Sequence, residues 1–367
     1  MFNAVTRSFT VSRALIVIFA VLGYLLLSPV HQGESVTLLH REPWFFSIWY
    51  QWDSNWYMSI AQYGYHWVAG DQSNVAFFPL YPVSMKALGF VLGKRYLIAG
   101  LMISATSLYA AMFLLFRLIR DDFGEDIARR ATWLMSIFPT AFFFTAPYTE
   151  SLFLLLSVAC FYYARKGRWA TSGYLGFFAA MTRISGLLLI IPLLYELMAQ
   201  QSFSPLKRMR RQTLWLLLIP AGLAVYMTFL YIGFGEPAAF AQAQEAGWGH
   251  TVTPVWSSFI KDFNQLIHGE RWVIWETAAT ALGLTSAFVA FKKLPLSYAL
   301  YLLASIMLPL GGGTMKSMSR YLLVAFPVFI LLAMATRRRF VYWAISAGFI
   351  ILLAVATASF ISGRWVA

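Results

Sequence analysis

One carboxylate of this sequence lies in a cluster of aromatic residues, where a charged group needs a partner or a task. Asp53 lies within the segment Tyr50–Tyr65, and its neighbours Trp52, Trp56 and Tyr57 are aromatic. In a helix, Asp53, Trp56 and Tyr57 would share one face. An acidic group among aromatic residues at a membrane boundary is costly unless it has a partner or a task. The alternative is an amphipathic interfacial helix that Asp53 caps.

Three cations have the chemistry of a phosphate site. Arg183 lies in the segment Met181–Gly186, and Lys316 and Arg320 lie in the segment Gly311–Tyr321. Guanidinium and ammonium groups bind phosphate or pyrophosphate, and a glycine run allows a ligand to approach the backbone closely. The alternative is that these side chains reach toward lipid phosphates at a membrane surface.

A third polar group stands at a tight turn within Phe138–Phe153. Pro147 ends one predicted helix, and Thr149 can cap the next one with Glu150 in its first turn. The helix dipole favours a carboxylate at that position. Capping alone therefore accounts for Glu150, although not for keeping a charge so close to a membrane.

Several catalytic and binding motifs are absent from the sequence. It has no HExxH or other paired metal spacing, no GxxxxGK[ST] phosphate loop, no GxSxG elbow and no Asp-x-Asp pair. The single cysteine, Cys160, excludes a disulfide within the chain. We therefore expect no metal and no cofactor, and ATP-driven transport and metal-dependent use of a nucleotide sugar lose support.

The elements that hold these residues are predicted to cross a membrane many times. The chain is 60% hydrophobic and 12% charged, against about 45–50% and about 25% in soluble domains. Its apolar runs of roughly 17–22 residues match a hydrocarbon layer. The net charge of +13 comes from short basic loops between these runs, which argues against nucleic-acid binding and for anionic lipid on one face.

Charge distribution sets the predicted topology, with the N-terminus inside and one integral membrane domain over residues 1–367. Eighteen of the 28 Lys and Arg residues then lie inside. The same rule makes 77–93 a Pro-broken interfacial helix and divides 169–200 into two short spans with Arg183 at their outer turn. Two sizeable outer segments result, 31–96 and 234–271. The eleven spans are predicted at residues 14–30, 97–116, 131–147, 149–164, 169–183, 184–200, 212–233, 272–291, 296–313, 321–336 and 340–361.

Taken in order, the outer motifs resemble those of one enzyme family. The set WD, IAxxGY, NxAFFPLYP, PYTESLF, RxSG and SRYL is similar to that of the PIG-V group of mannosyltransferases, GPI mannosyltransferase 2 and its prokaryotic relatives. The resemblance implies an all-α GT-C glycosyltransferase fold with interfacial helices in the first outer loop. It also implies a polyprenyl-phosphate-mannose donor, metal-independent transfer on the outer face, and Asp53 as the catalytic base.

On this interpretation the chain moves a hexose, which the resemblance implies to be mannose, to a glycolipid or glycan acceptor with inversion at the anomeric carbon. Arg183, Lys316 and Arg320 would bind the donor phosphate. A multi-pass protein of a prokaryotic plasma (inner) membrane is expected. The residues expected to bind sugar or acceptor are Trp52, Trp56, Tyr57, Asn74, Tyr148 and Glu150.

Two other classes of protein also fit many apolar spans with a few charges. One is a transporter or flippase for a lipid or polar solute, and the other is an inactive scaffold subunit. Transporters typically carry internal repeats and broken helices near the midplane. Here no repeat is visible and the polar residues gather at one boundary, which favours the enzyme.

Overall fold

The computed structural model describes residues 1–28, 42–201, 209–270 and 272–366. Every regular element in these ranges is a helix, and no strand occurs in them, which confirms the predicted all-α class. Of the predicted outer segments, residues 31–41 and residue 271 lie outside the described residues, as do the predicted inner-loop residues 207 and 208.

Within the described ranges, five helices are long and apolar enough to cross a membrane. They are α1 (Phe2–Leu26), α6 (Tyr96–Phe123), the stretch Gln212–Phe234 that ends α11 (Met209–Leu216) and forms α12 (Leu218–Phe234), α15 (Trp272–Lys293) and α19 (Arg339–Ile361). A sixth span is formed if the bent pair α17 (Met318–Val324) and α18 (Pro327–Ala335) is counted as one. The multi-pass membrane character is thus supported, and the count of eleven crossings stays a prediction.

The described chain forms two compact units. Unit 1 comprises Met1–Gly64, Tyr81–Leu152 and Leu332–Ala367, and unit 2 comprises Tyr65–Leu80 and Phe153–Leu331. The remaining helices of unit 1 are α3 (Trp44–Ser47), α4 (Asp53–Tyr63), α5 (Leu80–Val91), α7 (Glu125–Ser136) and the 3-10 turn η2 (Ala141–Phe144). The single domain expected over the whole chain stays a prediction.

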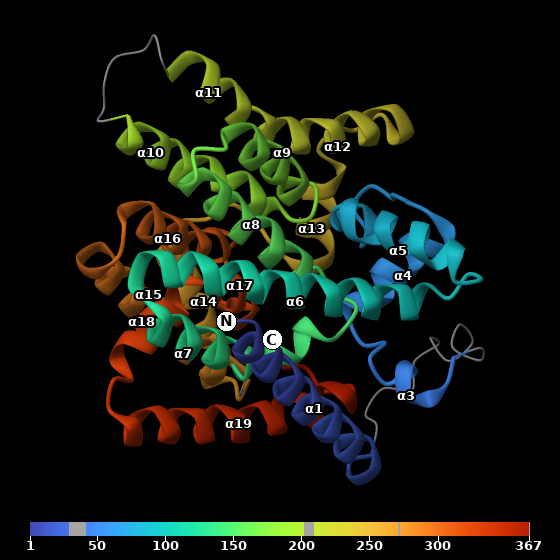
Figure 1. The fold of residues 1–367 in the computed structure, drawn as a ribbon. Coiled ribbons are helices and arrows are strands. Elements are labelled where there is room, and N and C mark those ends of the chain that lie inside the picture. Colours follow the sequence, from blue (N-terminus) through green and yellow to red (C-terminus); the bar gives the residue numbers. More distant parts are fainter. Residues whose placement is uncertain (29–41, 202–208, 271, 367) are drawn as a thin grey trace. The chain divides into compact units, whose positions relative to one another are not determined.

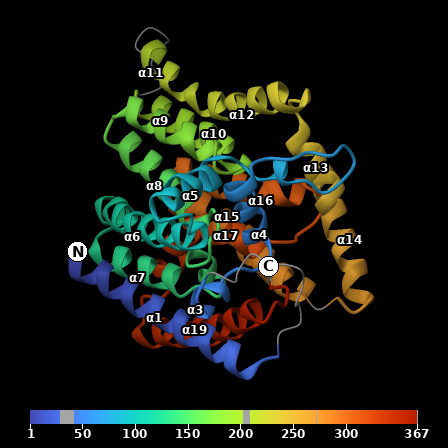
Figure 2. The same ribbon diagram turned by 90° about the vertical axis from the view of Figure 1, so that its right-hand side faces the viewer.

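In unit 1 the first and last helices of the chain lie side by side (Figures 1 and 2). The contact is close because α1 presents Gly23 to Ala358 of α19. A Cβ at position 23 would lie 2.6 Å from the Ala358 Cα, well inside van der Waals contact. Close packing of this kind depends on a residue without a side chain at the crossing.

Unit 2 contains the helices between Phe153 and Leu331, where α9, α10, α11 and α12 gather together in both views (Figures 1 and 2). Its elements are η1 (Asn74–Ala76), most of α8 (Glu150–Arg165), α9 (Trp169–Ala180), η3 (Ile184–Leu189), α10 (Ile190–Gln200), α11, α12, α13 (Ala239–Trp248), α14 (Val255–Ile267), α15, α16 (Leu296–Gly311), α17 and most of α18.

The two stretches 77–93 and 169–200 form short helices instead of one long span each, as predicted. Helix α5 begins directly after Pro79 and has only 12 residues, in agreement with a short helix rather than a span. Pro82 is tolerated in its first turn, where N–H groups have no helical acceptor. Likewise 169–200 breaks at Met181–Arg183, between α9 and η3.

The predicted span 131–147 is wrong as a single helix. Helix α7 ends at Ser136, and only η2 is helical between Ile137 and Thr149. Pro139 is the physical reason, because its ring disfavours helix in the residue before it and clashes with a carbonyl four residues back. The apolar composition of the run concealed this break.

The freed carbonyls at this break are bound by an arginine from α1. Arg13 donates to the carbonyl oxygens of Ser136 (2.8 Å) and Ala141 (3.1 Å) and to the hydroxyl of Thr145 (2.9 Å). A cation is favoured at the C-terminal end of α7, where unpaired carbonyls carry partial negative charge. Arg13, expected only as an inner anchoring charge, therefore stabilises the break.

A second departure lies within the predicted span 321–336. Helices α17 and α18 are bent by 82° at Ala325 and Phe326. Pro327 follows this break directly, and a helix ends before the residue that precedes a proline. The hydroxyl of Tyr301 donates to the Val324 carbonyl at the bend (3.1 Å).

We expect Gly23→Ala to lower the thermal unfolding midpoint of the protein in detergent. The added methyl group must displace α19, and overpacking of this kind costs about 1–3 kcal/mol. Gly348→Ala is the matched control, because Gly348 also lies in a membrane helix, α19, and has no atom within 4 Å of an added Cβ. Equal midpoints for the two variants would contradict the close contact.

Candidate active site

The predicted carboxylate stands directly after an unusual backbone turn. Asp53 is the first residue of α4, and Trp52 before it has φ 54° and ψ −119°. A positive φ is rare for a bulky residue and is kept only where surrounding bonds hold it. The predicted helix is therefore present, with Asp53 at its start.

The hydroxyl of Tyr148 holds this turn on both sides. It donates to the carbonyl oxygen of Gln51 (2.9 Å) and accepts from the backbone N–H of Asp53 (3.1 Å). Trp52 is thus bridged by one buried side chain. Within unit 1 this contact joins two motifs, WD and PYTESLF, that lie 95 residues apart.

Buried tyrosines pack against one another next to the turn. The Tyr57 ring packs edge-on against Tyr81 (5.3 Å between centroids) and Tyr148 (6.3 Å). The hydroxyl of Tyr81 bonds Ser104, whose hydroxyl donates to the Ala146 carbonyl (2.9 Å). These contacts give Tyr57 and Tyr148 a supporting position under the turn, and their predicted stacking on the sugar stays untested.

The other predicted residues of unit 1 lie at the edges of this arrangement. The Trp52 ring packs edge-on against Trp365 (5.2 Å), and Trp56 is partly exposed on α4. Glu150 is the first residue of α8 and is fully buried. Its predicted place in the first turn of a helix is confirmed, and its role toward sugar stays a prediction.

In unit 2, Arg183 lies over two aromatic rings at the break between α9 and η3. Its guanidinium carbon is 5.9 Å from the centre of the Phe153 ring and 5.1 Å from that of Tyr321. Tyr321 follows Arg320 in α17. The structure therefore brings Arg183 to the segment that carries the other two predicted cations.

Two buried carboxylates that sequence reasoning did not single out hold that segment. Asp262 accepts from the Met315 N–H (2.6 Å) and the Thr314 hydroxyl (3.2 Å). Glu276 accepts from the N–H (2.9 Å) and the hydroxyl (3.1 Å) of Ser319. Burial raises the pKa of the Asp262 carboxyl above its ordinary value, and the bonds from Met315 and Thr314 oppose that rise.

A signal for one of these two carboxylates is present in the sequence. Glu276 stands within the apolar run that forms α15, and an ionisable residue inside a span is by default a candidate for function. Asp262 has no comparable signal, because it lies in a mixed polar and apolar segment. Its importance follows only from its contacts.

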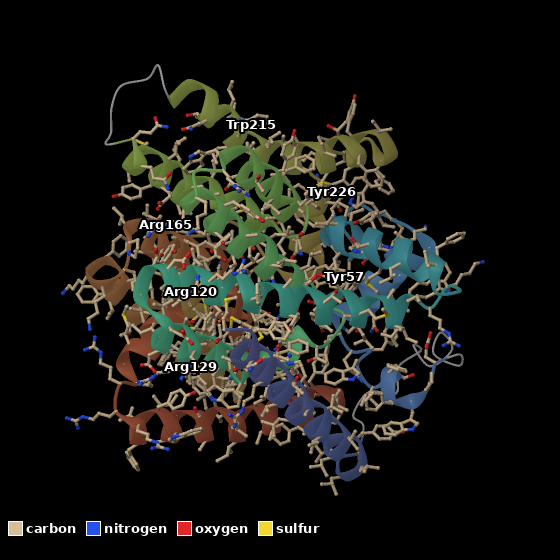
Figure 3. The ribbon with its side chains drawn as sticks, in the orientation of Figure 1. Tyr57, Arg120, Arg129, Arg165, Trp215 and Tyr226 are labelled. Carbon is tan, nitrogen blue, oxygen red and sulfur yellow. The ribbon has the colours of Figure 1, made fainter. Side chains whose placement is uncertain are left out.

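Asn74 has a clear local role in unit 2. The side-chain oxygen Oδ1 of Asn74 accepts from the His66 backbone N–H (2.8 Å), and the side chain is fully buried in η1. The neighbouring Val75 carbonyl accepts from the hydroxyl of Tyr226 in α12 (2.7 Å; Figure 3). Asn74 thus orders the loop before η1, while a contact with sugar stays a prediction.

The predicted site residues fall into two groups, each described within its own unit. We call Trp52, Asp53, Trp56, Tyr57, Tyr148 and Glu150 of unit 1 the carboxylate group, and Arg183, Lys316 and Arg320 of unit 2 the cation group. Asn74 also belongs to unit 2. Across the described ranges, no three His, Cys, Asp or Glu side chains cluster in a way that could hold a metal ion.

Comparison with known proteins decides the family. The family model described as Mannosyltransferase (PIG-V) matches residues 6–264. The chain belongs to this family. The match covers the whole carboxylate group, Asn74, Arg183 and Asp262, and it ends before α15.

Two named relatives extend this finding. GPI mannosyltransferase 2 of Yarrowia lipolytica is 33% identical over 195 residues, which cover 50% of this chain and 51% of that protein. GPI alpha-1,6-mannosyltransferase 2 of Homo sapiens is 26% identical over 249 residues, covering 58% and 50%. This PIG-V chain therefore spans about half the length of the curated relatives it matches.

A solved structure shows the fold. The crystal structure of ArnT from Cupriavidus metallidurans bound to undecaprenyl phosphate matches with a TM-score of 0.56 at 10% identity, covering 95% of this chain and 63% of that one. At this identity the likeness concerns the fold alone. It confirms the GT-C architecture that the sequence motifs implied.

We expect Tyr148→Phe to slow mannose transfer roughly tenfold or more if Asp53 is the predicted base, because loosening the turn displaces the Asp53 carboxylate. Tyr109→Phe is the control, since it removes a single hydroxyl contact, to Thr6, in the same unit. Rates are compared at matched amounts of folded protein. Equal rates for both variants would show that the Tyr148 bridge is dispensable.

Proposed function

We propose that this PIG-V mannosyltransferase transfers mannose from a polyprenyl-phosphate donor to a hydroxyl group of a glycolipid or glycan, without a metal and with inversion at the anomeric carbon. The observation that carries the proposal is the bridged turn at Trp52, which fixes a carboxylate at the start of α4. Strain kept at one position by dedicated bonds is typical of functional sites.

In the proposed reaction Asp53 accepts the proton of the acceptor hydroxyl as its oxygen attacks the anomeric carbon. The bond between that carbon and the phosphate oxygen breaks, and the phosphate leaves with the electron pair. A single displacement of this kind inverts the anomeric centre and needs one carboxylate. A double displacement would need a second carboxylate as nucleophile, by the logic established for glycosidases.

The cation group is assigned to the leaving phosphate, whose negative charge grows as the bond breaks. Preformed positive charge at such a point is usually the largest electrostatic contribution to catalysis. Arg320 is almost fully buried. The guanidinium of Arg183 lies over the ring of Tyr321, the residue that follows Arg320. Two guanidinium groups with restricted freedom fit this role better than flexible surface lysines.

Support for the donor and the acceptor comes from the relatives. ArnT, the structural neighbour, is described with bound undecaprenyl phosphate, and the two named relatives are GPI mannosyltransferases. We therefore propose a polyprenyl-phosphate-mannose donor and a glycolipid acceptor. From the distribution of Lys and Arg we propose that the N-terminus is cytoplasmic and that the reaction takes place on the outer face. A prokaryotic inner membrane is proposed from the resemblance to the prokaryotic relatives alone.

We expect Asp53→Asn to abolish transfer from polyprenyl-phosphate-mannose, with loss of about 10²-fold or more, because the amide cannot accept the proton. Asp71→Asn is the matched control, since Asp71 is exposed and its carboxylate accepts from the N–H of the neighbouring Gln72. Turnover of Asp53→Asn near the wild-type value would remove Asp53 from the mechanism.

We expect Arg320→Ala to raise the KM for the donor lipid more than that for the acceptor, because the cation contacts the donor phosphate. Arg129→Ala removes an exposed guanidinium paired with Glu125 (Figure 3) and serves as the control. Equal losses for donor and acceptor would indicate a structural role. Movement of intact donor lipid across vesicles without a new glycosidic bond would select the flippase instead.

A further inference from the structure

The segment that carries Lys316 and Arg320 has an irregular backbone. Between α16 and α17 the chain runs through Gly312–Ser317, which we call the cation loop. Gly313 has φ 84° and Ser317 has φ 65°. A serine at positive φ is uncommon and persists only where neighbouring bonds fix it. The loop therefore depends on contacts from other elements.

Asp262 of α14 supplies two of these contacts from one side. Both of its carboxylate oxygens are used, one by the Met315 N–H and one by the Thr314 hydroxyl. The Thr314 hydroxyl also accepts from the Lys316 N–H (3.1 Å). Lys316 is thus tied to the carboxylate through its own backbone and through the residues before it.

Glu276 of α15 supplies the contacts from the other side. Its two oxygens accept from the N–H and the hydroxyl of Ser319, the second residue of α17. That N–H has no acceptor within the helix, because the first N–H groups of any helix lack one. Glu276 also attracts Arg320, the next residue, electrostatically.

The same part of the chain fixes the end of α16. The Thr253 N–H donates to the Gly311 carbonyl (3.0 Å), and the Ser258 hydroxyl donates to the Leu310 carbonyl (2.6 Å). Ser258 and Asp262 are four residues apart and therefore share one face of α14. That face of α14 therefore hydrogen-bonds both ends of the segment Leu310–Met315.

Two fully buried carboxylates, those of Asp262 and Glu276, accept bonds from the same short segment. Burying a carboxylate is costly unless its hydrogen bonds are made. Here each one accepts bonds from backbone N–H and hydroxyl groups on the flanks of Lys316. These bonds set the position of the loop.

We propose that Asp262 and Glu276 are positioning residues, which hold the cation loop and the start of α17 so that Lys316 and Arg320 face the donor phosphate. The inference rests on the donor proposed above. It assigns the predicted outer segment 234–271, through α14, to donor binding. Neither carboxylate contacts the donor in this proposal.

The test uses the full-length protein purified in detergent, with Asp262→Asn and Glu276→Gln. Each variant keeps the shape of the side chain and replaces one acceptor oxygen by an amide NH₂. Two readouts are taken: kcat/KM for polyprenyl-phosphate-mannose and for the acceptor, and hydrogen–deuterium exchange of the amides of residues 314–319. Ser319→Ala, which removes one of the two bonds to Glu276 from the loop side, is a milder second variant.

Glu196→Gln is the matched control. Glu196 is a buried carboxylate of the same unit and is bonded by Arg165 (3.1 Å; Figure 3), Gln200 (2.9 Å) and Ser297 (2.7 Å). Glu196 lies on α10, and none of these three partners belongs to the cation loop. Its variant is expected to lower the thermal unfolding midpoint with donor kcat/KM unchanged.

For Asp262→Asn and Glu276→Gln we expect donor kcat/KM to fall roughly tenfold to hundredfold, as displaced groups typically do, with faster exchange at Met315 and Ser319. Ser319→Ala should shift both readouts in the same direction by less. Donor kcat/KM that falls no more than in Glu196→Gln, or unchanged exchange at 314–319, overturns the positioning role. Absence of transfer by the wild type refutes the proposed donor, and the exchange readout then decides separately whether the carboxylates hold the loop.

Discussion

Backbone groups freed where a helix breaks must find partners inside this protein, because an apolar environment offers no water to bind them. In unit 1 the hydroxyl of Tyr148 binds both sides of Trp52, and the guanidinium of Arg13 binds the carbonyls after α7. In unit 2 Tyr301 binds the carbonyl at the bend before α18, and Asp262 and Glu276 bind the loop before α17. A polar side chain from elsewhere in the chain therefore accompanies each of these breaks.

This requirement explains why the predicted site residues lie where the backbone is irregular. A continuous helix satisfies its own backbone and can present a side chain only along its surface. A break allows a residue to stand at a helix start, as Asp53 does, or in a loop, as Lys316 does. The bonds that satisfy the freed backbone groups of a break also fix its geometry. Reacting groups need such fixed geometry.

Much of the helical frame could be predicted from the sequence, because apolar runs of sufficient length specify spans. The break at Arg183 and the short helix after Pro79 followed from charge and proline. The break at Pro139 and the 82° bend before Pro327 were missed, since the surrounding runs are as apolar as a true span. For the site, Asp53 at a helix start was predictable, whereas Asp262 and Glu276 act on backbone 53 and 43 residues away, which no local pattern reveals.

The pairing of α1 with α19 has a consequence for how the protein is made. Gly23 meets Ala358, so the face of α1 that carries Gly23 can be covered only after α19 has been synthesised. Until then the face of α1 that carries Gly23 lacks its α19 neighbour. The α1–α19 packing of unit 1 thus forms long after α1 itself is made, and a truncation before Ala358 would uncover a face of a helix synthesised much earlier.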